Sequence, residues 1–471
     1  MERYMKRNFE MMTIKIILLV VFVFVGCKAQ QDNIVFKSKG KVDYPLSNDE
    51  TKLLDSIQYR SFLFFTQESD PTNGLVKDRS ASWAPASIAA IGFALPSYAV
   101  GVERNWISRD EAAKITLNTL KFFFNSVQST DTNATGYKGF YYHFLRINSG
   151  TREWNCELSS VDTGLLMMGI IFARNYYDLD NDIENKIRLL AEKLINRLDW
   201  EFFKMPPTGE YANTISMGWT PEEGMHFMGW NGYNEALFLY ILAAGSGMKN
   251  VEASYDSWLA SYDWRTPYPE LSHVVFPPLF GHQFSHTFID FRGIVDKYMK
   301  EKGIDYFENS RRATFVQRLY AIDNPHNWAG YDSLCWGITA SDGPTDKYNF
   351  DDKKFIGYAG RGTSGPDLNY FDDGTIAPYA AISSIVFAPE IVFPTIKSIN
   401  EKYGKGLWGP YGYFDSFNPT LNWFNKEYIG IDQGPLLLMI ENFRTGLIWN
   451  YVMKDSVIQM GLTLLGFEYL K

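Results

Sequence analysis

The sequence predicts an all-α fold, an (α/α)6 toroid in which inner and outer helices alternate and loops at one end form a cleft. Helical periodicity recurs along the chain and indicates about twelve helices, whereas strand signals are few. A superhelical solenoid is the competing architecture, but no fixed-period repeat is visible. The chain has 471 residues, and helical toroids are an exception to the usual division of such lengths into several domains. We therefore expect residues 45–471 to form a single domain.

The helix starts are readable from capping boxes. Ser47 precedes Glu50, and Ser108 precedes Glu111, at the spacing that satisfies free amide groups at a helix start. The first of these helices is expected to run to Gln67. The other helices are expected at about 85–100, 108–127, 158–177, 181–203, 232–246, 251–262, 286–303, 309–322, 376–404 (interrupted near Pro389), 432–453 and 455–466.

Two segments do not follow the helical pattern. Residues 139–144 are expected to form a short hairpin with the segment near Arg152. The stretch 327–375 is rich in Gly, Asp, Asn and Tyr and has almost no helical period. A long irregular segment inside a compact domain is usually functional or disordered, and its aromatic residues argue against disorder.

The N-terminus is typical of an exported protein. Basic side chains precede an apolar run from Ile16 to Val25, which is too short for a permanent membrane span. The run ends at Gly26-Cys27, which resembles the lipobox of bacterial lipoproteins, and an ordinary secretory signal with a stray cysteine is the alternative. We expect residues 1–27 to be a signal peptide, residues 28–44 a flexible tether, and the protein to be lipid-anchored at Cys27 in the cell envelope, facing the periplasm or the outer surface.

Composition excludes some classes of partner and favours carbohydrate. The net charge is −9 without a run of Lys or Arg, so no nucleic acid is expected. The six histidines show no zinc-binding spacing, and we expect no metal and no cofactor. Aromatic residues make up 16% of the chain, with 13 Trp and 29 Tyr, and such rings stack on the apolar faces of sugars. We expect a monomer that contacts the membrane only through its lipid.

Acidic residues at expected helix starts are the first candidates for chemistry. Glu157 and Asp162 flank one helix start near Trp154, where they either cap the helix or bind a ligand. Glu235 enters a strongly apolar helix next to Trp230 and Tyr233. Partial desolvation there raises the pKa of a carboxyl group, which suits a general acid.

The later part of the chain adds further candidates. His282 and His286 are four residues apart, but no metal-binding HExxH motif joins them, so hydrogen bonding to a ligand is the favoured interpretation. Asp373 stands beside glycine, where turn formation alone explains an aspartate. Asp415 and Asp432 follow loops rich in glycine and aromatic residues, and one of them is the candidate base.

Four motifs in this order resemble the glucoamylase-like domain family, which includes the endo-β-1,2-glucanases of glycoside hydrolase family 144. They are the segments 229–236, 337–343, 373–378 and 430–435, and the resemblance extends over residues 45–455. It implies an (α/α)6 barrel that hydrolyses β-1,2-glucan with inversion, with an acid and a base about 6.5–9.5 Å apart. It assigns Glu235 as the acid and Asp162 to sugar binding, and it leaves the base open between Asp415 and Asp432, with Asp342 not excluded.

The expected function is therefore an endo-β-1,2-glucanase that releases sophoro-oligosaccharides. The predicted catalytic residues are Glu235, Asp432, Asp415 and Asp342. The predicted substrate-binding residues are Glu157, Asp162, Trp154, Trp230, Tyr233, Asn234, His282, His286, Trp336 and Asp373. A non-catalytic glycan-binding lipoprotein and a polysaccharide lyase are the alternatives, and exo action on the same linkage stays open.

Overall fold

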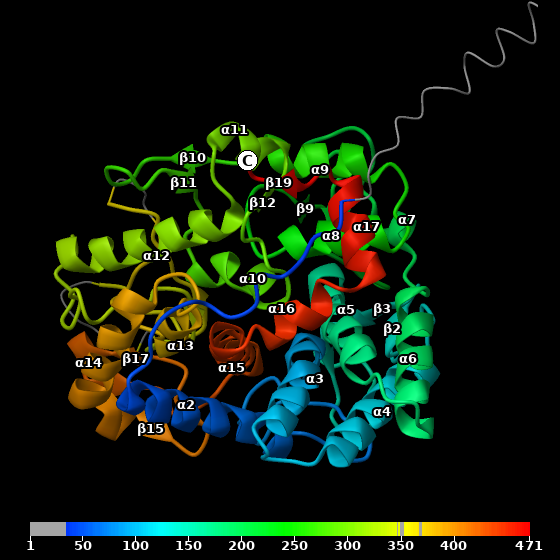
Figure 1. Ribbon diagram of the computed structural model, residues 1–471, viewed down its shortest axis with the longest axis horizontal. Helices are drawn as coiled ribbons and strands as arrows, with labels where there is room; N and C mark the ends of the chain where they lie inside the picture. The colour runs from blue at the N-terminus through cyan, green and yellow to red at the C-terminus, as the bar shows by residue number, and fades with distance from the viewer. Residues whose placement is uncertain (1–33, 346, 349–352, 367–369) are drawn as a thin grey trace, which may run out of the picture. The chain divides into compact units, whose positions relative to one another are not determined.

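The computed structural model of the chain describes residues 34–345, 347–348, 353–366 and 370–471 (Figure 1). The chain divides into two compact units, Met1–Phe36 and Lys37–Lys471, and the second contains every element described below. The expected signal peptide, Cys27 and the first part of the tether lie outside the described residues. Within the described ranges, the helices are all too short or too polar to cross a membrane.

The unit Lys37–Lys471 is mostly helical, which confirms the predicted class. Its α-helices are α2 (Asn48–Gln67), α3 (Ile88–Glu103), α4 (Arg109–Asn125), α5 (Ser160–Tyr176), α6 (Asp182–Ile195), α7 (Trp200–Phe203), α8 (Leu237–Gly245), α9 (Val251–Ala260), α10 (Phe284–Phe288), α11 (Lys297–Lys302), α12 (Tyr306–Asp323), α13 (Pro378–Ser383), α14 (Pro389–Leu407), α15 (Gly430–Arg444), α16 (Leu447–Val452) and α17 (Ser456–Leu464). The 3-10 helices are η1 (Leu279–His282) and η2 (Pro419–Leu421). Both predicted capping boxes form, at the start of α2 and of α4.

The strands are short and antiparallel. One sheet has the order β2-β3-β5-β7-β8, formed by β2 (Gly136–Tyr137), β3 (Phe140–Tyr142), β5 (Leu158–Ser159), β7 (Gly218–Thr220) and β8 (Gly224–Met225). The remaining strands pair two by two, as β1 (Ala86–Ser87) with β4 (Phe144–Leu145), β6 (Ile215–Ser216) with β9 (Gly229–Trp230), β10 (Trp264–Arg265) with β11 (His273–Val274), β12 (Ile294–Val295) with β19 (Glu468–Tyr469), β13 (Ala340–Ser341) with β14 (Ala359–Gly360), β15 (Trp408–Gly409) with β16 (Gly412–Tyr413), and β17 (Phe417–Asn418) with β18 (Trp423–Phe424).

Four of the expected helices are wrong in extent. The expected helix 181–203 is divided into α6 and α7, and the expected helix 432–453 is divided into α15 and α16. The expected helix 286–303 is two separate helices, because Gly293 takes a left-handed φ of 75° and β12 follows it before α11 begins. The expected helix 232–246 begins only at Leu237, after a turn at the preceding residues. The interruption near Pro389 is confirmed, since Pro389 is the first residue of α14. The described part of 327–375 contains no helix, as expected.

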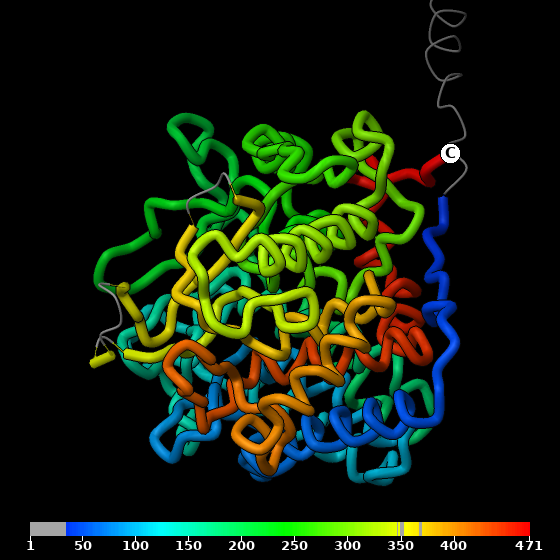
Figure 2. Tube along the Cα trace, turned by 90° about the vertical axis from the view of Figure 1, so that its left-hand side faces the viewer, coloured from blue at the N-terminus to red at the C-terminus, as the bar shows by residue number. Residues whose placement is uncertain are grey.

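Four helices, α3, α5, α8 and α15, are buried along nearly their whole length and form the centre of the unit (Figure 1). Helix α3 packs on α5 through two glycines: a Cβ on Gly169 would lie 2.1 Å from the carbonyl oxygen of Gly92. This close backbone approach holds the middle of α5 against the first turns of α3. Helix α2, early in the chain, packs against α15, late in the chain (Figures 1 and 2). The starts of α5, α8 and α15 carry the acidic residues considered next.

Candidate active site

A cavity of about 440 Å³ lies beside the starts of α5, α8 and α15. Four of the predicted site residues, Glu157, Asp162, Trp230 and Glu235, line it together. The full lining is His143, Glu157, Ser159, Val161, Asp162, Leu165, Met217, Gly218, His226, Trp230, Glu235, Phe280, Phe284, Tyr358 and Ile431. The segments that contribute these residues are far apart in the sequence, so the cavity exists only in the folded chain.

One wall of the cavity is an imidazole between two carboxylates. Nδ1 of His143 lies 2.9 Å from Oε1 of Glu157, and Nε2 lies 3.7 Å from Oδ1 of Asp162. The pairing of β3 with β5 places His143 beside Glu157, and the His143 amide donates to the Glu157 carbonyl at 3.0 Å. The Ser159 hydroxyl caps α5 by accepting from the Asp162 amide and also donates to the Asp162 carboxylate. Capping and site formation thus use the same side chains.

The charges of this wall stabilise one another. Burial opposes a charged imidazole, but the charge of Asp162 and the hydrogen bond to Glu157 raise the pKa of His143 to about 9. Burial would raise the pKa of Glu157, but the hydrogen bond and charge of His143 bring it below its usual range. At neutral pH His143 is therefore an imidazolium flanked by two carboxylates.

Glu235 is an acid of the cavity wall whose carboxyl group is buried. It lies in the turn before α8, which begins at Leu237, and not inside the helix as expected, and its Oε2 is buried without a hydrogen-bond partner among the described residues. Burial raises the pKa of Glu235 to about 7, a bond from its own backbone amide opposes the rise, and the charge of Asp162 adds to it. The predicted rise in pKa is confirmed. A carboxyl group with this pKa can hold a proton at neutral pH and donate it.

A second group of carboxyls lies next to the same cavity. Asp432 is in the first turn of α15 and follows Ile431, which lines the cavity. Burial, and then the charge of Asp342, raises the pKa of Asp415 to about 7. Burial, the charge of Asp415 and a hydrogen bond between the two carboxyls raise the pKa of Asp432. Because two such groups cannot readily both ionise, they compete for one proton.

Asp342 has a different environment from that pair. Its backbone amide donates to Oδ2 of Asp415 at 2.8 Å, which orients that carboxyl. Its own carboxylate accepts from Arg79 at 3.0 and 3.2 Å and from Asn425 at 2.9 Å. Arg79 also pairs with Asp78 at 3.1 Å and with Glu427 at 3.3 Å. The Asp342 carboxylate is thus bound to Arg79 and Asn425, while the Asp342 amide orients Asp415.

Sequence reasoning missed three residues of this site: His143, Arg79 and Tyr358. Tyr358 lines the cavity, and burial together with the charges of Asp432 and Asp415 raises its pKa. Each of the three gains its significance from partners distant in the sequence. The expected hairpin of 139–144 with the segment near Arg152 is observed as a single bridge between Leu145 and Arg152, whereas the pairing of β3 with β5, which places His143 beside Glu157, was not predicted.

Tyr233, Asn234 and Trp336 were predicted to bind substrate, but their side chains contact other parts of the protein. Tyr233 stacks on Tyr306 with ring centroids 5.8 Å apart, and only 5% of it is exposed. Oδ1 of Asn234 accepts from the Ala236 amide at 2.9 Å, which shapes the turn before α8. Trp336 is completely buried in the core. The structure therefore does not bring these three side chains to the cavity, since packing or turn formation occupies them.

The two histidines and Asp373 are also away from the cavity. His282 and His286 are buried, and burial lowers the pKa of both, that of His286 to about 3. Nε2 of His286 lies 3.0 Å from the Ser310 hydroxyl. Asp373 is completely buried in an ion pair with Arg361 at 2.8 Å. Their side chains contact protein on every side, so in this structure they do not reach a ligand in the cavity.

Trp154 lies outside the cavity but close to its wall. Its ring centroid is 5.1 Å from that of Phe144, and the Phe144 ring stacks on His143 at 3.8 Å. Trp154 is half exposed, so it belongs to the surface that surrounds the cavity rather than to its lining.

The His143, Glu157 and Asp162 side chains offer one ligand atom each within 4.8 Å of one another, a set of donors that a metal ion can use. The pKa of His143, about 9, means that an ion must displace the imidazolium proton at neutral pH. Mutual ion pairing therefore accounts for the arrangement of the three.

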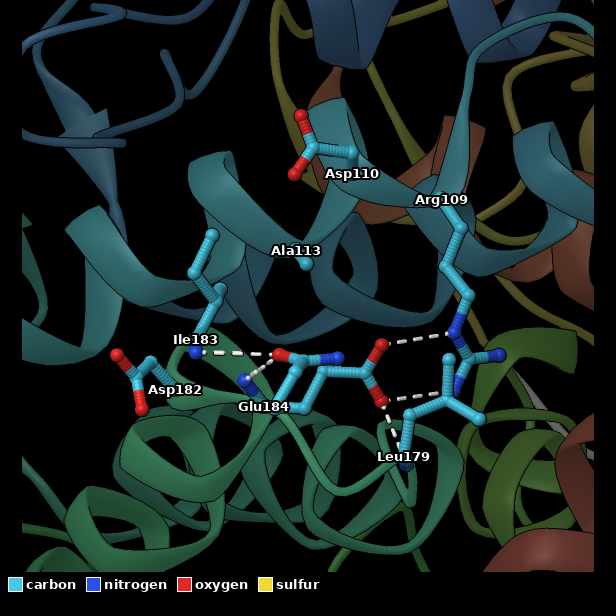
Figure 3. A pocket seen from close by; sticks show the side chains of 8 residues that line it. Arg109, Asp110, Ala113, Leu179, Asp182, Ile183 and Glu184 are labelled. Carbon is cyan, nitrogen blue, oxygen red and sulfur yellow. Dashed lines mark hydrogen bonds and ion pairs between the residues drawn. The ribbon is translucent and has the colours of Figure 1, made fainter.

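A larger cavity, of about 540 Å³, lies between the starts of α4 and α6 (Figure 3). Its centre is the Arg109 guanidinium, which donates to both carboxylate oxygens of Glu184 at 2.9 Å. The Leu179 amide also donates to Glu184 at 2.9 Å. Asp110 and Asp182 lie apart from this pair in the view of Figure 3. Arg109 and Glu184 neutralise each other in an ion pair, so neither is available as a catalytic acid or base, and we assign this cavity a structural role.

Known proteins resemble the chain along most of its length. A family model described as "Putative glucoamylase" matches residues 227–456. An exo beta-1,2-glucooligosaccharide sophorohydrolase (non-reducing end) of Parabacteroides distasonis is 27% identical over 456 residues, which cover 89% of this chain and 58% of that protein. The chain thus spans little more than half the length of this curated relative.

Solved structures show the same similarity. A putative glucoamylase from Bacteroides uniformis superposes with a TM-score of 0.77 at 32% identity, covering 91% of this chain and 99% of that one. An endo-beta-1,2-glucanase from Chitinophaga pinensis, solved with sophorotriose and glucose, gives a TM-score of 0.75 at 25% identity, covering 90% of this chain and 99% of that one.

Proposed function

The chain belongs to the glucoamylase-like family, and from the carboxyl groups around its cavity we propose that it is a glycoside hydrolase that cleaves β-1,2-glucan. One observation carries the proposal: Glu235, a buried carboxyl group with a pKa of about 7, lines the same cavity that the Asp415–Asp432 pair adjoins. An acid that holds its proton near neutral pH, together with a second ionisable carboxyl group, is what glycoside hydrolysis requires.

The relatives support the linkage. The Parabacteroides protein is named for exo release of sophorose units and the Chitinophaga protein for endo cleavage of β-1,2-glucan. We assign endo action, with sophoro-oligosaccharides as products, and exo action is the alternative that product analysis separates. The mostly helical unit would then be an (α/α)6 barrel, with the cavity and the aromatic loops around it forming the substrate cleft.

The proposed reaction uses Glu235 as the general acid, which protonates the oxygen of the leaving sugar. The Asp415–Asp432 pair takes a proton from the attacking water, and Asp432 is the member next to the cavity lining. Since the pKa values of Asp415 and of Glu235 are both raised to about 7, a state with Glu235 neutral and one carboxyl of the pair ionised is populated near pH 7. Direct attack of water on the opposite face of the sugar inverts the anomeric centre.

The other cavity residues bind and orient the sugar in this proposal. The carboxylates of Glu157 and Asp162 accept hydrogen bonds from hydroxyl groups, and Trp230 offers an apolar face. Asp342 acts through its amide, because Arg79 and Asn425 occupy its carboxylate. Asp342 is therefore a positioning residue for Asp415.

Substitution of His143 tests this arrangement. His143→Gln removes the positive charge that faces Asp162, and we expect kcat/KM to fall about tenfold or more because a charge-assisted hydrogen bond is lost. The uncompensated charge of Asp162 then raises the pKa of Glu235 further, so the alkaline limb of the pH–rate profile moves to higher pH. His326→Gln, at an exposed histidine, is the control. An unchanged alkaline limb would show that His143 does not tune the acid.

Product analysis of residues 32–471 tests the function itself. The substrates are linear β-1,2-glucan, starch, laminarin and a uronate polymer. Sophoro-oligosaccharides of several lengths from the first substrate alone support endo action on β-1,2-glucan, whereas sophorose alone indicates exo action. Glucose from starch overturns the linkage, and an unsaturated product that absorbs ultraviolet light indicates a lyase. Absence of product from every substrate, with glycan binding retained, indicates a binding lipoprotein.

We further propose that the protein acts as a monomer held in the cell envelope by lipid on Cys27. The basic start, the apolar run and the Gly26-Cys27 ending support this location. Cys27→Ser is expected to move the protein from the membrane fraction to the soluble fraction of the cell. If the Cys27→Ser variant stays in the membrane fraction to the same extent as the wild type, the lipid assignment is wrong.

A further inference from the structure

Trp83 and Trp154, 71 positions apart in the sequence, meet at the surface of the protein. Their ring centroids are 5.9 Å apart at an interplanar angle of 45°. Trp83 is 61% exposed and Trp154 is 51% exposed. Leaving apolar surface in water forgoes about 25 cal/mol per Å² of stabilisation. Neighbouring exposed apolar side chains mark interaction sites more often than single ones do.

The turn that carries Trp154 is strained and firmly held. Trp154 and Asn155 both have left-handed backbones, with φ of 56° and 51°. Such a conformation costs roughly 1–2 kcal/mol for each residue that is not glycine. The Arg152 guanidinium is 1% exposed and holds the turn by donating to the carbonyls of Asn155 at 2.7 Å and Cys156 at 2.6 Å. Glu222 fixes the guanidinium in turn, at 2.8 and 3.0 Å. The Trp154 ring is therefore presented in a fixed place.

The loop that carries Trp83 is also fixed. The Asp78 amide donates to the Pro85 carbonyl at 2.8 Å, which closes the loop. The Ser80 amide donates to the Tyr428 carbonyl at 3.1 Å, close before α15 and Asp432. The Arg79 guanidinium lies 5.8 Å from the centre of the Trp83 ring while it holds Asp342. Trp83 is thus tied to the segment that carries the proposed base.

Both rings are linked to the cavity wall through contacts between neighbouring side chains. From Trp154, ring contacts of 5.1 Å to Phe144 and of 3.8 Å from Phe144 to His143 lead directly into the cavity wall. The Arg79 guanidinium contacts the Trp83 ring and forms an ion pair with Asp342. The Asp342 amide in turn donates to Asp415, one member of the Asp415–Asp432 pair. The two tryptophans therefore lie on the side of the cavity that His143 forms. The cavity, at about 440 Å³, holds only a short piece of a polysaccharide.

We propose that Trp83 and Trp154 form an accessory subsite, a rigid aromatic platform on which a glucose residue of the β-glucan chain stacks beyond the cavity. This inference rests on the proposed function and adds to it a preference for long chains. A fixed pair of aromatic faces suits a sugar ring, because the C–H faces of the ring stack on it and its hydroxyls stay in water. Since the rings are already held in place, binding requires little ordering of the protein.

The test compares substrates of different length. For the doubly substituted protein, Trp83→Ala with Trp154→Ala, we expect KM for long linear β-1,2-glucan to rise about tenfold relative to KM for the shortest sophoro-oligosaccharide that is cleaved. The kcat on the long substrate is expected to stay the same, because the platform binds sugar away from the reacting bond. Tyr59→Ala removes a 43% exposed aromatic ring from α2 and is the matched control. Equal KM ratios for the wild type and the double variant overturn the subsite.

Binding measurements separate this inference from the proposed function. If the wild type cleaves no β-1,2-glucan, the same polymer is titrated against Glu235→Gln with and without the two tryptophan substitutions, by isothermal calorimetry. Weaker binding after loss of the tryptophans supports the platform even though the hydrolase assignment has failed. Equal binding, or no binding by either protein, overturns the platform. If the double variant instead converts a dimer to a monomer without changing KM, the rings are a contact between two copies, and the subsite is likewise overturned.

Discussion

Glu235→Gln is expected to lower kcat on β-1,2-glucan by about 10³-fold, while binding of the polymer is retained. The amide has nearly the shape of the carboxyl group but cannot donate a proton to the leaving oxygen. Glu223→Gln, at an exposed glutamate outside the cavity lining, is the matched control and should retain activity. Steady-state kinetics on the polymer provides the measurement. Turnover within a few-fold of the wild type would remove Glu235 from the mechanism.

The same substitution should stabilise the protein at alkaline pH. Burial raises the pKa of Glu235 from 4.5 to about 7 in the folded state. Its contribution to stability is therefore fully present below pH 4.5 and is lost as pH rises through about 7. Glutamine does not ionise, so at pH 8 the variant should exceed the wild type by roughly 3 kcal/mol in free energy of unfolding. Urea unfolding at pH 8 and at pH 4 checks this, and a difference that does not depend on pH would contradict it.

Arg361→Met is expected to lower the free energy of unfolding by about 3–5 kcal/mol, because it leaves Asp373 buried without its partner. The guanidinium donates twice to the Asp373 carboxylate at 2.8 Å. It also donates to the Ser341 carbonyl at 2.6 Å and to the Gly357 carbonyl at 3.1 Å. One side chain therefore holds both the residue before Asp342 and the residue before Tyr358.

Loss of this pair should reduce activity as well as stability, since Asp342 orients Asp415. Arg265→Met breaks an exposed ion pair with Asp263 and is the matched control, with a much smaller expected loss of stability because solvent screens the pair. Urea unfolding midpoints compare the two variants, and kcat measured well below each midpoint reports the effect on the site. Equal unfolding midpoints for the two variants would show that the buried pair contributes no more to stability than the exposed pair.

The residues that the sequence predicted well are those whose environment is local. Glu235 precedes an apolar helix, so burial of its carboxyl group could be inferred from its neighbours along the chain. The capping boxes of α2 and α4 depend on residues three apart and were predicted for the same reason.

Residues whose role depends on distant partners were not predictable. Asp373 was a candidate ligand because it stands in one of the four family-like motifs, and nothing in its neighbours along the chain reveals the buried ion pair with Arg361. His143 was overlooked because its carboxylate partners reach it only through strand pairing and the start of α5. The helix expected at 286–303 failed because the left-handed backbone at Gly293 is set by a turn, whereas the apolar pattern on both sides continues.

The cavity draws its walls from two different parts of the chain. The segment 227–456, which the family model matches, contains Glu235, Asp415 and Asp432. His143 and the two tryptophans of the platform come from before it. The groups proposed to transfer protons and the two platform tryptophans thus lie in different parts of the sequence, so substitution of Trp83 and Trp154 can change which glycans are held without altering the groups that break the bond. Mutant libraries at these two tryptophans that leave Arg79, His143 and Asp162 unchanged are the economical route to new chain-length preferences.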